Sequence, residues 1–107
     1  QRINAAGTYS NLTNWGSAWS TTIVDVPVPL LVQLRTSATS VETSNIGVDD
    51  GVTTYTTGTF TLSATQYSTQ LPAIRYTHGS AALTQYRPYH IIANNNTSAY
   101  IAVSAEL

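Results

Sequence analysis

The chain contains no cysteine, no methionine and no lysine, and only 8% of its 107 residues are charged. Without cysteine there is no disulfide, no catalytic thiolate and no cysteine-ligated zinc site. The four basic residues are all arginines, they are dispersed along the chain, and the net charge is −1. Because nucleic-acid binding requires a concentrated basic surface, we do not expect a nucleic-acid partner.

Long apolar runs are missing as well. No stretch approaches the ~20 apolar residues that a membrane-spanning helix requires, so membrane insertion is not expected. The first ten residues lack the charged start and the apolar stretch of a secretory signal, and without an initial methionine we expect a processed chain or a fragment. The polar surface is neutral instead, with 18 Thr, 11 Ser and 7 Asn. This composition favours a virion or extracellular location.

The residues that are abundant favour β-structure. Thr, Tyr, Val and Ile pack well on a pleated sheet, and seven Tyr, two Trp and one Phe can fill the core of one domain spanning residues 1–107. Apolar residues recur with a period of two, which is the pattern of half-buried strands. We predict strands at residues 23–26, 30–35, 52–56, 59–64, 71–76, 83–93 and 98–105, and at most one helical turn at residues 65–70.

Turn chemistry suggests how these strands connect. Asp49-Asp50-Gly51 is a turn signal, and Thr57-Gly58 predicts a hairpin between strands 52–56 and 59–64, with Phe60 and Leu62 facing the core. The Asn-rich residues 94–97 predict a second turn, which pairs strand 83–93 with strand 98–105. Short strands with frequent turns indicate an all-β fold, either a small antiparallel, jelly-roll-like β-sandwich or a small barrel. Residues 1–9 could form an extended arm.

Catalytic and metal chemistry find little support in the sequence. His78 stands beside Ser80, but serine is common in this chain and no G-x-S-x-G nucleophile motif is present. Two histidines without a third ligand at useful spacing do not predict a zinc site, and Asp49-Asp50 lacks the pattern of a calcium loop. We therefore predict a protein that is not an enzyme, with no catalytic residue, no metal and no cofactor.

Saccharide contact is better supported, because flat aromatic rings can stack on sugars while arginine and neutral groups bond to hydroxyls. Two tryptophans lie in a Gly/Ser/Asn-rich stretch, residues 11–20, that reads as a loop, and two further clusters combine aromatic and donor side chains. The candidate carbohydrate-binding residues are Trp15, Trp19, Tyr76, His78, Tyr86, Arg87, Tyr89 and His90. The alternative, which we weigh ahead of sugar binding, is that these aromatics fill the core or a subunit interface.

Three asparagines stand in N-x-S/T triplets. They are Asn11, Asn95 and Asn96, and they would be glycosylated only in a chain secreted by a competent host. Such triplets also arise by chance in a sequence rich in Thr and Asn.

Residues 87–107 combine an Arg-Pro-Tyr opening, an Asn/Ser/Thr turn, an aromatic strand and an Ala-Glu-Leu ending. This stretch resembles the C-terminal strands of phage tail-fibre and virion-appendage proteins. The resemblance implies a distal or surface virion domain, commonly trimeric, that contacts host glycans, and it carries no functional residue across. A receptor-binding domain and a viral capsid or decoration subunit belong to the same hypothesis. The low charge also favours self-association.

Two other functions remain open from the sequence. The chain could be a subunit of an extracellular filament or pilus, in which residues 1–9 pair with the sheet edge of a neighbour by β-augmentation. It could also be a free-standing, lectin-like carbohydrate-binding module. The expected partners are thus further copies of the chain, as a trimer or polymer, and a host-surface saccharide.

Overall fold

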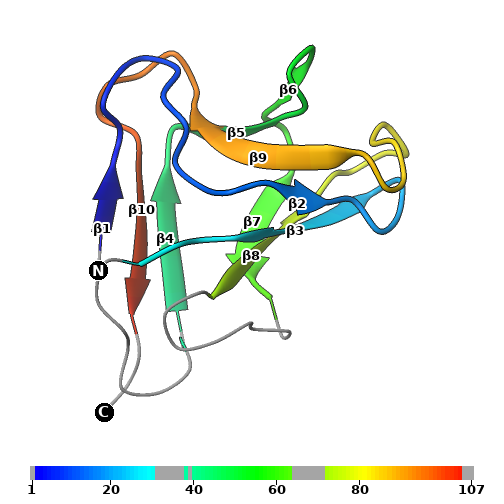
Figure 1. Cartoon of the computed structure of the whole chain (residues 1–107), viewed down its shortest axis with the longest axis horizontal. Coiled ribbons are helices and arrows are strands. Elements are labelled where there is room, and N and C mark those ends of the chain that lie inside the picture. Colours follow the sequence, from blue (N-terminus) through cyan, green and yellow to red (C-terminus); the bar gives the residue numbers. More distant parts are fainter. Residues whose placement is uncertain (1, 31–37, 39, 64–71, 105–107) are drawn as a thin grey trace.

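The computed structural model describes residues 2–30, 38, 40–63 and 72–104, which form ten strands and no helix. The all-β prediction is confirmed, and the compact arrangement of three antiparallel sheets is that of a small β-sandwich (Figure 1). The strands are β1 (Arg2–Asn4), β2 (Gly16–Ser17), β3 (Ile23–Pro27), β4 (Ser40–Ser44), β5 (Ile46–Asp49), β6 (Thr54–Tyr55), β7 (Thr59–Leu62), β8 (Ala73–Thr77), β9 (Pro88–Ala93) and β10 (Tyr100–Ser104).

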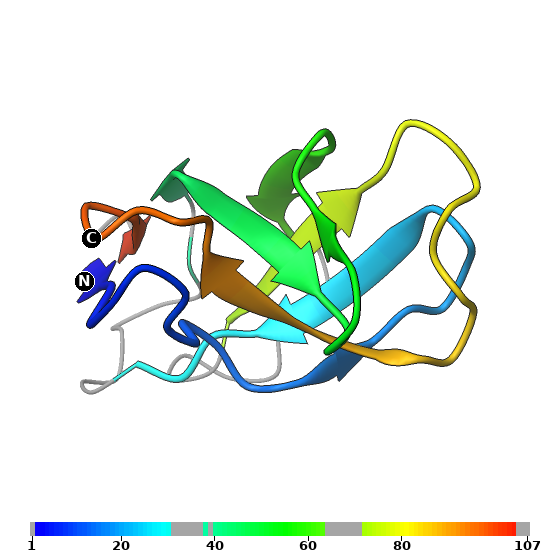
Figure 2. The ribbon, with the colours of Figure 1, turned by 90° about the horizontal axis from the view of Figure 1, so that it is seen from above.

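The three sheets have the strand orders β1-β10-β4, β2-β9-β5-β6 and β3-β8-β7. β1, β10 and β4 run side by side at one end of the molecule, and β5 and β9 lie above β3 and β8 (Figure 1). Viewed from above, β5 and β9 lie next to each other across the β3-β8-β7 sheet (Figure 2). Crossed layers of this kind enclose one core between the inner faces of the sheets.

The core follows from the alternation of side chains along the strands. In β3, Val24 and Val26 are fully buried while Asp25 between them reaches the surface. β10 repeats the pattern with Ile101 and Val103. β9 differs, because every residue after Pro88 is buried. A strand that is buried on both faces lies centrally in the fold, and β9 is accordingly paired on both of its edges.

Local sequence patterns located several strands correctly. The predicted strand 23–26 is β3, strand 98–105 contains β10, and strands 71–76 and 83–93 overlap β8 and β9. Phe60 and Leu62 pack against the core as predicted, whereas Thr59 and Thr61 are exposed. Residues 31–35 of the predicted strand 30–35 and the predicted helical turn at residues 65–70 lie outside the described part of the chain.

The hairpin predicted around Thr57-Gly58 is wrong. Predicted strand 52–56 shrinks to β6, which pairs with β5, while β7 pairs with β8. Gly58 lacks the positive φ that a two-residue type I′ hairpin would need. It packs instead on β8, where an added Cβ would lie 2.3 Å from the carbonyl oxygen of Thr77. The true hairpin turn is Asp50–Thr53, where Gly51 has φ +96°.

The predicted pairing of strand 83–93 with strand 98–105 is also wrong. β9 pairs with β2 and β5, whereas β10 pairs with β1 and β4 in another sheet. The Asn-rich turn between them does form, and Asn95 takes the predicted left-handed conformation with φ 50°. Two of its backbone N–H groups, however, donate to other segments: that of Asn94 to the Asn45 carbonyl and that of Asn96 to the Thr8 carbonyl. The chain therefore passes from one sheet to another here.

The N-terminal residues contribute a strand to their own domain. β1 pairs antiparallel with β10, and the Ala5 N–H continues the contact by donating to the Ala99 carbonyl at 2.9 Å. The guanidinium of Arg2 lies 3.8 Å above the ring of Tyr100, and the hydroxyl of that tyrosine donates to Glu42 at 2.7 Å. Side chains from three neighbouring strands thus hold β1 against the sheet.

Candidate functional site

The exposed tryptophans flank the short strand β2. Along this segment the burial alternates: Trp15, Ser17 and Trp19 are exposed, whereas Ala18 is buried completely. Gly16 faces inward and touches β3 so closely that an added Cβ would lie 2.1 Å from the Asp25 carbonyl oxygen. The prediction that residues 11–20 form a loop is therefore incomplete, because this stretch contains the strand β2. We call the outward side chains of Trp15, Ser17 and Trp19 the tryptophan face.

Trp15 is held in place by a row of side chains that crosses the β2-β9-β5-β6 sheet. Its ring stacks on His90 with 3.8 Å between centroids and 8° between planes. His90 Nε2 bonds to a carboxylate oxygen of Asp49 at 3.1 Å, and the Thr54 hydroxyl donates to the other oxygen of that carboxylate. His90 is 6% exposed, so one face of the Trp15 ring is covered while half of the side chain remains open to solvent.

Trp19 lies beside an ion pair of the β3-β8-β7 sheet. Asp25 and Arg75 are directly paired in register, and Arg75 donates from Nε and Nη2 to the two carboxylate oxygens at 2.9 and 3.1 Å. The guanidinium carbon is 5.2 Å from the centre of the Trp19 ring. The hydrogen bonds to Asp25 raise the pKa of Arg75, although burial alone would lower it. The pair is a fixed source of hydrogen-bond donors and acceptors.

Arg87, another predicted site residue, bonds to the turn between β5 and β6. It donates to Asp50 at 2.9 Å, and the side chain of Asp50 is only 2% exposed. Burial by itself would raise the pKa of Asp50. The N–H groups of Thr53 and Val52 and the guanidinium of Arg87 stabilise the ionised carboxylate more strongly, so the net effect is a lowered pKa. Arg87 is therefore part of a folded turn, and its guanidinium is paired with Asp50.

Several of the predicted aromatic residues belong to the core. Tyr76 and Tyr89 are fully buried, and the Tyr89 hydroxyl accepts the Thr84 N–H at 2.9 Å. The hydroxyl of Tyr76 bonds to His78 Nδ1 at 2.8 Å, and His78 packs edge-on against Tyr55. Because Tyr76 and Tyr89 have no exposed surface, they cannot contact a saccharide in this conformation. His78 packs against Tyr76 and Tyr55 in the same aromatic cluster.

The remaining predicted residues are on the surface. Tyr86 is 75% exposed and has φ 69°, an uncommon conformation for a non-glycine residue. Asn11 and Asn95 are exposed, and Asn96, half-buried, accepts the Ser98 N–H at 2.7 Å. Tyr86 follows the exposed residue Gln85, whose side chain donates to the Trp19 carbonyl, so it lies near one end of the tryptophan face.

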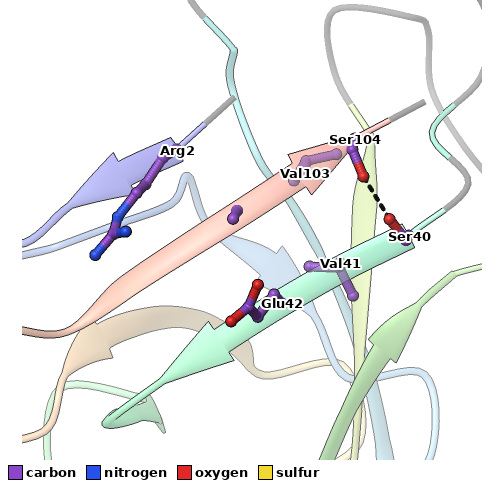
Figure 3. A pocket seen from close by; sticks show the side chains of 7 residues that line it. Arg2, Ser40, Val41, Glu42, Val103 and Ser104 are labelled. Carbon is purple, nitrogen blue, oxygen red and sulfur yellow. Dashed lines mark hydrogen bonds between the residues drawn. The ribbon is translucent and has the colours of Figure 1, made fainter. Parts of the chain in front are cut away.

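A pocket of about 560 Å³ lies elsewhere, on the β1-β10-β4 sheet (Figure 3). Arg2 of β1 and Glu42 of β4 flank β10, where both are in register with Ala102, and Ser40 and Ser104 bond to each other at one end. Its lining is Arg2, Ser40, Val41, Glu42, Ala102, Val103 and Ser104. None of the residues predicted to bind saccharide lies in this pocket.

The described residues offer limited reactive chemistry. The Asp49–His90 pair resembles the acid and base of a catalytic triad, but Nδ1 of His90 is buried and has no hydrogen-bond partner among the described residues. No group of three histidines or carboxylates within the described ranges could hold a metal ion. Nor does any helix there have the length and apolar character to cross a bilayer.

No protein-family model, curated protein or solved structure matches this chain. The class that its fold defines is a small all-β domain with three antiparallel sheets. Each of its two tryptophans lies against a neighbouring side chain, His90 or Arg75, and is still about half exposed to solvent.

Proposed function

We propose that this chain is a non-catalytic, self-associating β domain of a virion surface or appendage, and that it contacts host saccharide through the tryptophan face. The observation that carries the proposal is the exposure of Trp15 and Trp19, at 50% and 48%, on the same side of one short segment. Large apolar groups that are exposed within one short segment are candidates for a binding site. Each ring has a fixed support beneath or beside it, so little ordering is needed when a sugar stacks.

Tyr9 provides a matched control for this proposal. It is an aromatic side chain with 59% exposure, and its neighbour Thr8 bonds to Asn96, beyond the far end of β9 from His90. On a glycan array, we expect the unaltered protein and Tyr9→Ala to give the same signals, and Trp15→Ala and Trp19→Ala to lose them. Absence of any glycan signal from the folded protein would refute saccharide contact.

Self-association is measured separately by light scattering at high protein concentration. We expect a trimer or a larger assembly, because a surface with this little charge opposes association weakly. A stable monomer that still binds glycan would instead support a free-standing, lectin-like module. A stable monomer without glycan binding would contradict both parts of the proposal.

A second candidate function is a filament subunit joined by strand exchange. It is favoured by β1, which has three residues and, within the described part of the chain, a strand partner on one edge only. Exchange would require β1 to leave its own β10 and occupy that of a neighbour. Deletion of residues 1–9 should then abolish polymers, and polymers that persist after the deletion would exclude this mechanism.

A further inference from the structure

Resting on the saccharide-binding function proposed above, we infer that the ligand is an extended, uncharged oligosaccharide that lies across both tryptophans, with Arg75 and Asp25 bonding to its hydroxyls. The inference has three supports: the different sheets on which the two rings rest, the pairing of the charged groups that the described residues place beside them, and the fixed orientation of Trp15.

The separation of the rings sets the length of the ligand. Four residues of extended chain place the Cα atoms of Trp15 and Trp19 up to about 13 Å apart. The rings also diverge, since Trp15 stacks on His90 of β9 and Trp19 lies by Arg75 of β8, which belongs to a different sheet. The two indoles thus rest on side chains of different sheets, and we expect one sugar ring to be too small to stack on both. A ligand that uses both tryptophans is then expected to contain several linked rings.

The charges beside the rings select against acidic sugars. Arg75 is paired through two bonds with Asp25, and His90 is bonded to Asp49. A sialic acid carboxylate or a sulfate gains no net attraction here, because Asp25 already neutralises the guanidinium and would repel a second anion beside it. Hydroxyl groups need no displacement: of the five N–H donors of a guanidinium, two are used here, and three remain. The carboxylate of Asp25, in turn, keeps lone pairs that can accept hydroxyl protons.

The orientation of Trp15 is fixed before any ligand arrives. The Thr54 hydroxyl and His90 Nε2 bond to opposite oxygens of Asp49, and the imidazole ring is buried beneath the indole. Thr54, Asp49 and His90 are thus positioning residues that keep the outer face of the indole turned to solvent. A preformed flat platform favours the flat, apolar faces of successive sugar rings over a partner that must enclose the side chain.

The test uses the full chain and oligosaccharides of one to six rings, each length present in uncharged, sialylated and sulfated forms. We expect affinity for the uncharged series to rise with length until both tryptophans are covered. Trp15→Ala and Trp19→Ala should each raise Kd at least about tenfold for the long members, whereas Tyr9→Ala leaves Kd unchanged. Because no ionic contact is added, Kd should also stay constant as sodium chloride is increased.

The outcomes separate the two proposals. Binding that requires an acidic group, or that is already complete with one sugar ring, would overturn this inference while leaving saccharide contact intact. No binding to any series would overturn both. If the tryptophan variants change the mass of the assembly without any sugar being bound, the face is an interface between copies of the chain, and the inference is wrong.

Discussion

Because β2 packs closely on β3 at Gly16, we predict that replacing this glycine with alanine destabilises the fold. An alanine Cβ at this position would lie 2.1 Å from the Asp25 carbonyl oxygen and 2.9 Å from the Val26 Cα. These are backbone atoms of a strand that is paired with β8 along its whole length, so they cannot rotate away as a flexible side chain would. To accept Gly16→Ala, the two strands must separate by roughly 1 Å or more to restore van der Waals distances.

Overpacking of this kind costs about 1–3 kcal/mol of unfolding free energy. For a domain of about 100 residues, each kcal/mol lowers Tm by about 4–8 °C. Because Gly16 lies between the two exposed tryptophans, the shift of β2 should weaken saccharide binding as well. Thermal and urea unfolding of the variant, followed by circular dichroism, measures the loss of stability.

Gly79→Ala is the matched control. Gly79 is exposed, has no positive φ, and an added Cβ there would meet nothing within 4 Å. We expect this variant to be unchanged or more stable by up to about 1 kcal/mol, because alanine restricts the unfolded chain. Equal stability of the two variants would refute the close packing of β2 on β3, and with it the support on which the tryptophan face rests.

Three further predictions concern polar and ring contacts. The fold lowers the pKa of Asp50, so the stabilisation from its ionised carboxylate is fully present above about pH 4 and is lost as the pH falls further. In urea unfolding at a series of pH values, Asp50→Asn should therefore lose less stability on acidification than the unaltered protein. His90→Ala should destabilise by about 1–3 kcal/mol, because Asp49 loses a donor, and should reduce the near-UV dichroism of Trp15. Gly58→Ala should lower Tm, because its Cβ would meet the Tyr76 ring at 2.5 Å.

Local sequence information predicted this fold only in part. Alternation of apolar residues located β3 and β10, because their buried residues recur at every second position. These residues are Val24, Val26, Ile101 and Val103. Strand partners were harder, since pairing depends on contacts between distant segments. The sequence of residues 94–97 is typical of a hairpin turn, yet two of its N–H groups donate to Asn45 and Thr8, and the strands before and after it belong to different sheets.

The candidate site was predictable as a list of residue types but not as an arrangement. Nothing local distinguishes Tyr89, which fills the core, from Tyr86, which is exposed three residues earlier. The stack of Trp15 on His90 was missed, because it arises from the register of β2 on β9. The Asp25–Arg75 pair was missed for the same reason, although opposite charges at outward positions of two strands are a usable signal.

The central claim is that the tryptophan face binds saccharide, and intrinsic fluorescence tests it most directly. The chain contains two tryptophans, and both lie on that face, so all indole emission comes from the proposed site. Titration with the uncharged oligosaccharides that give the strongest array signals should shift the emission to shorter wavelength and saturate, because stacking removes water from the rings. Saturable binding measured by calorimetry with no change in tryptophan emission would contradict the account.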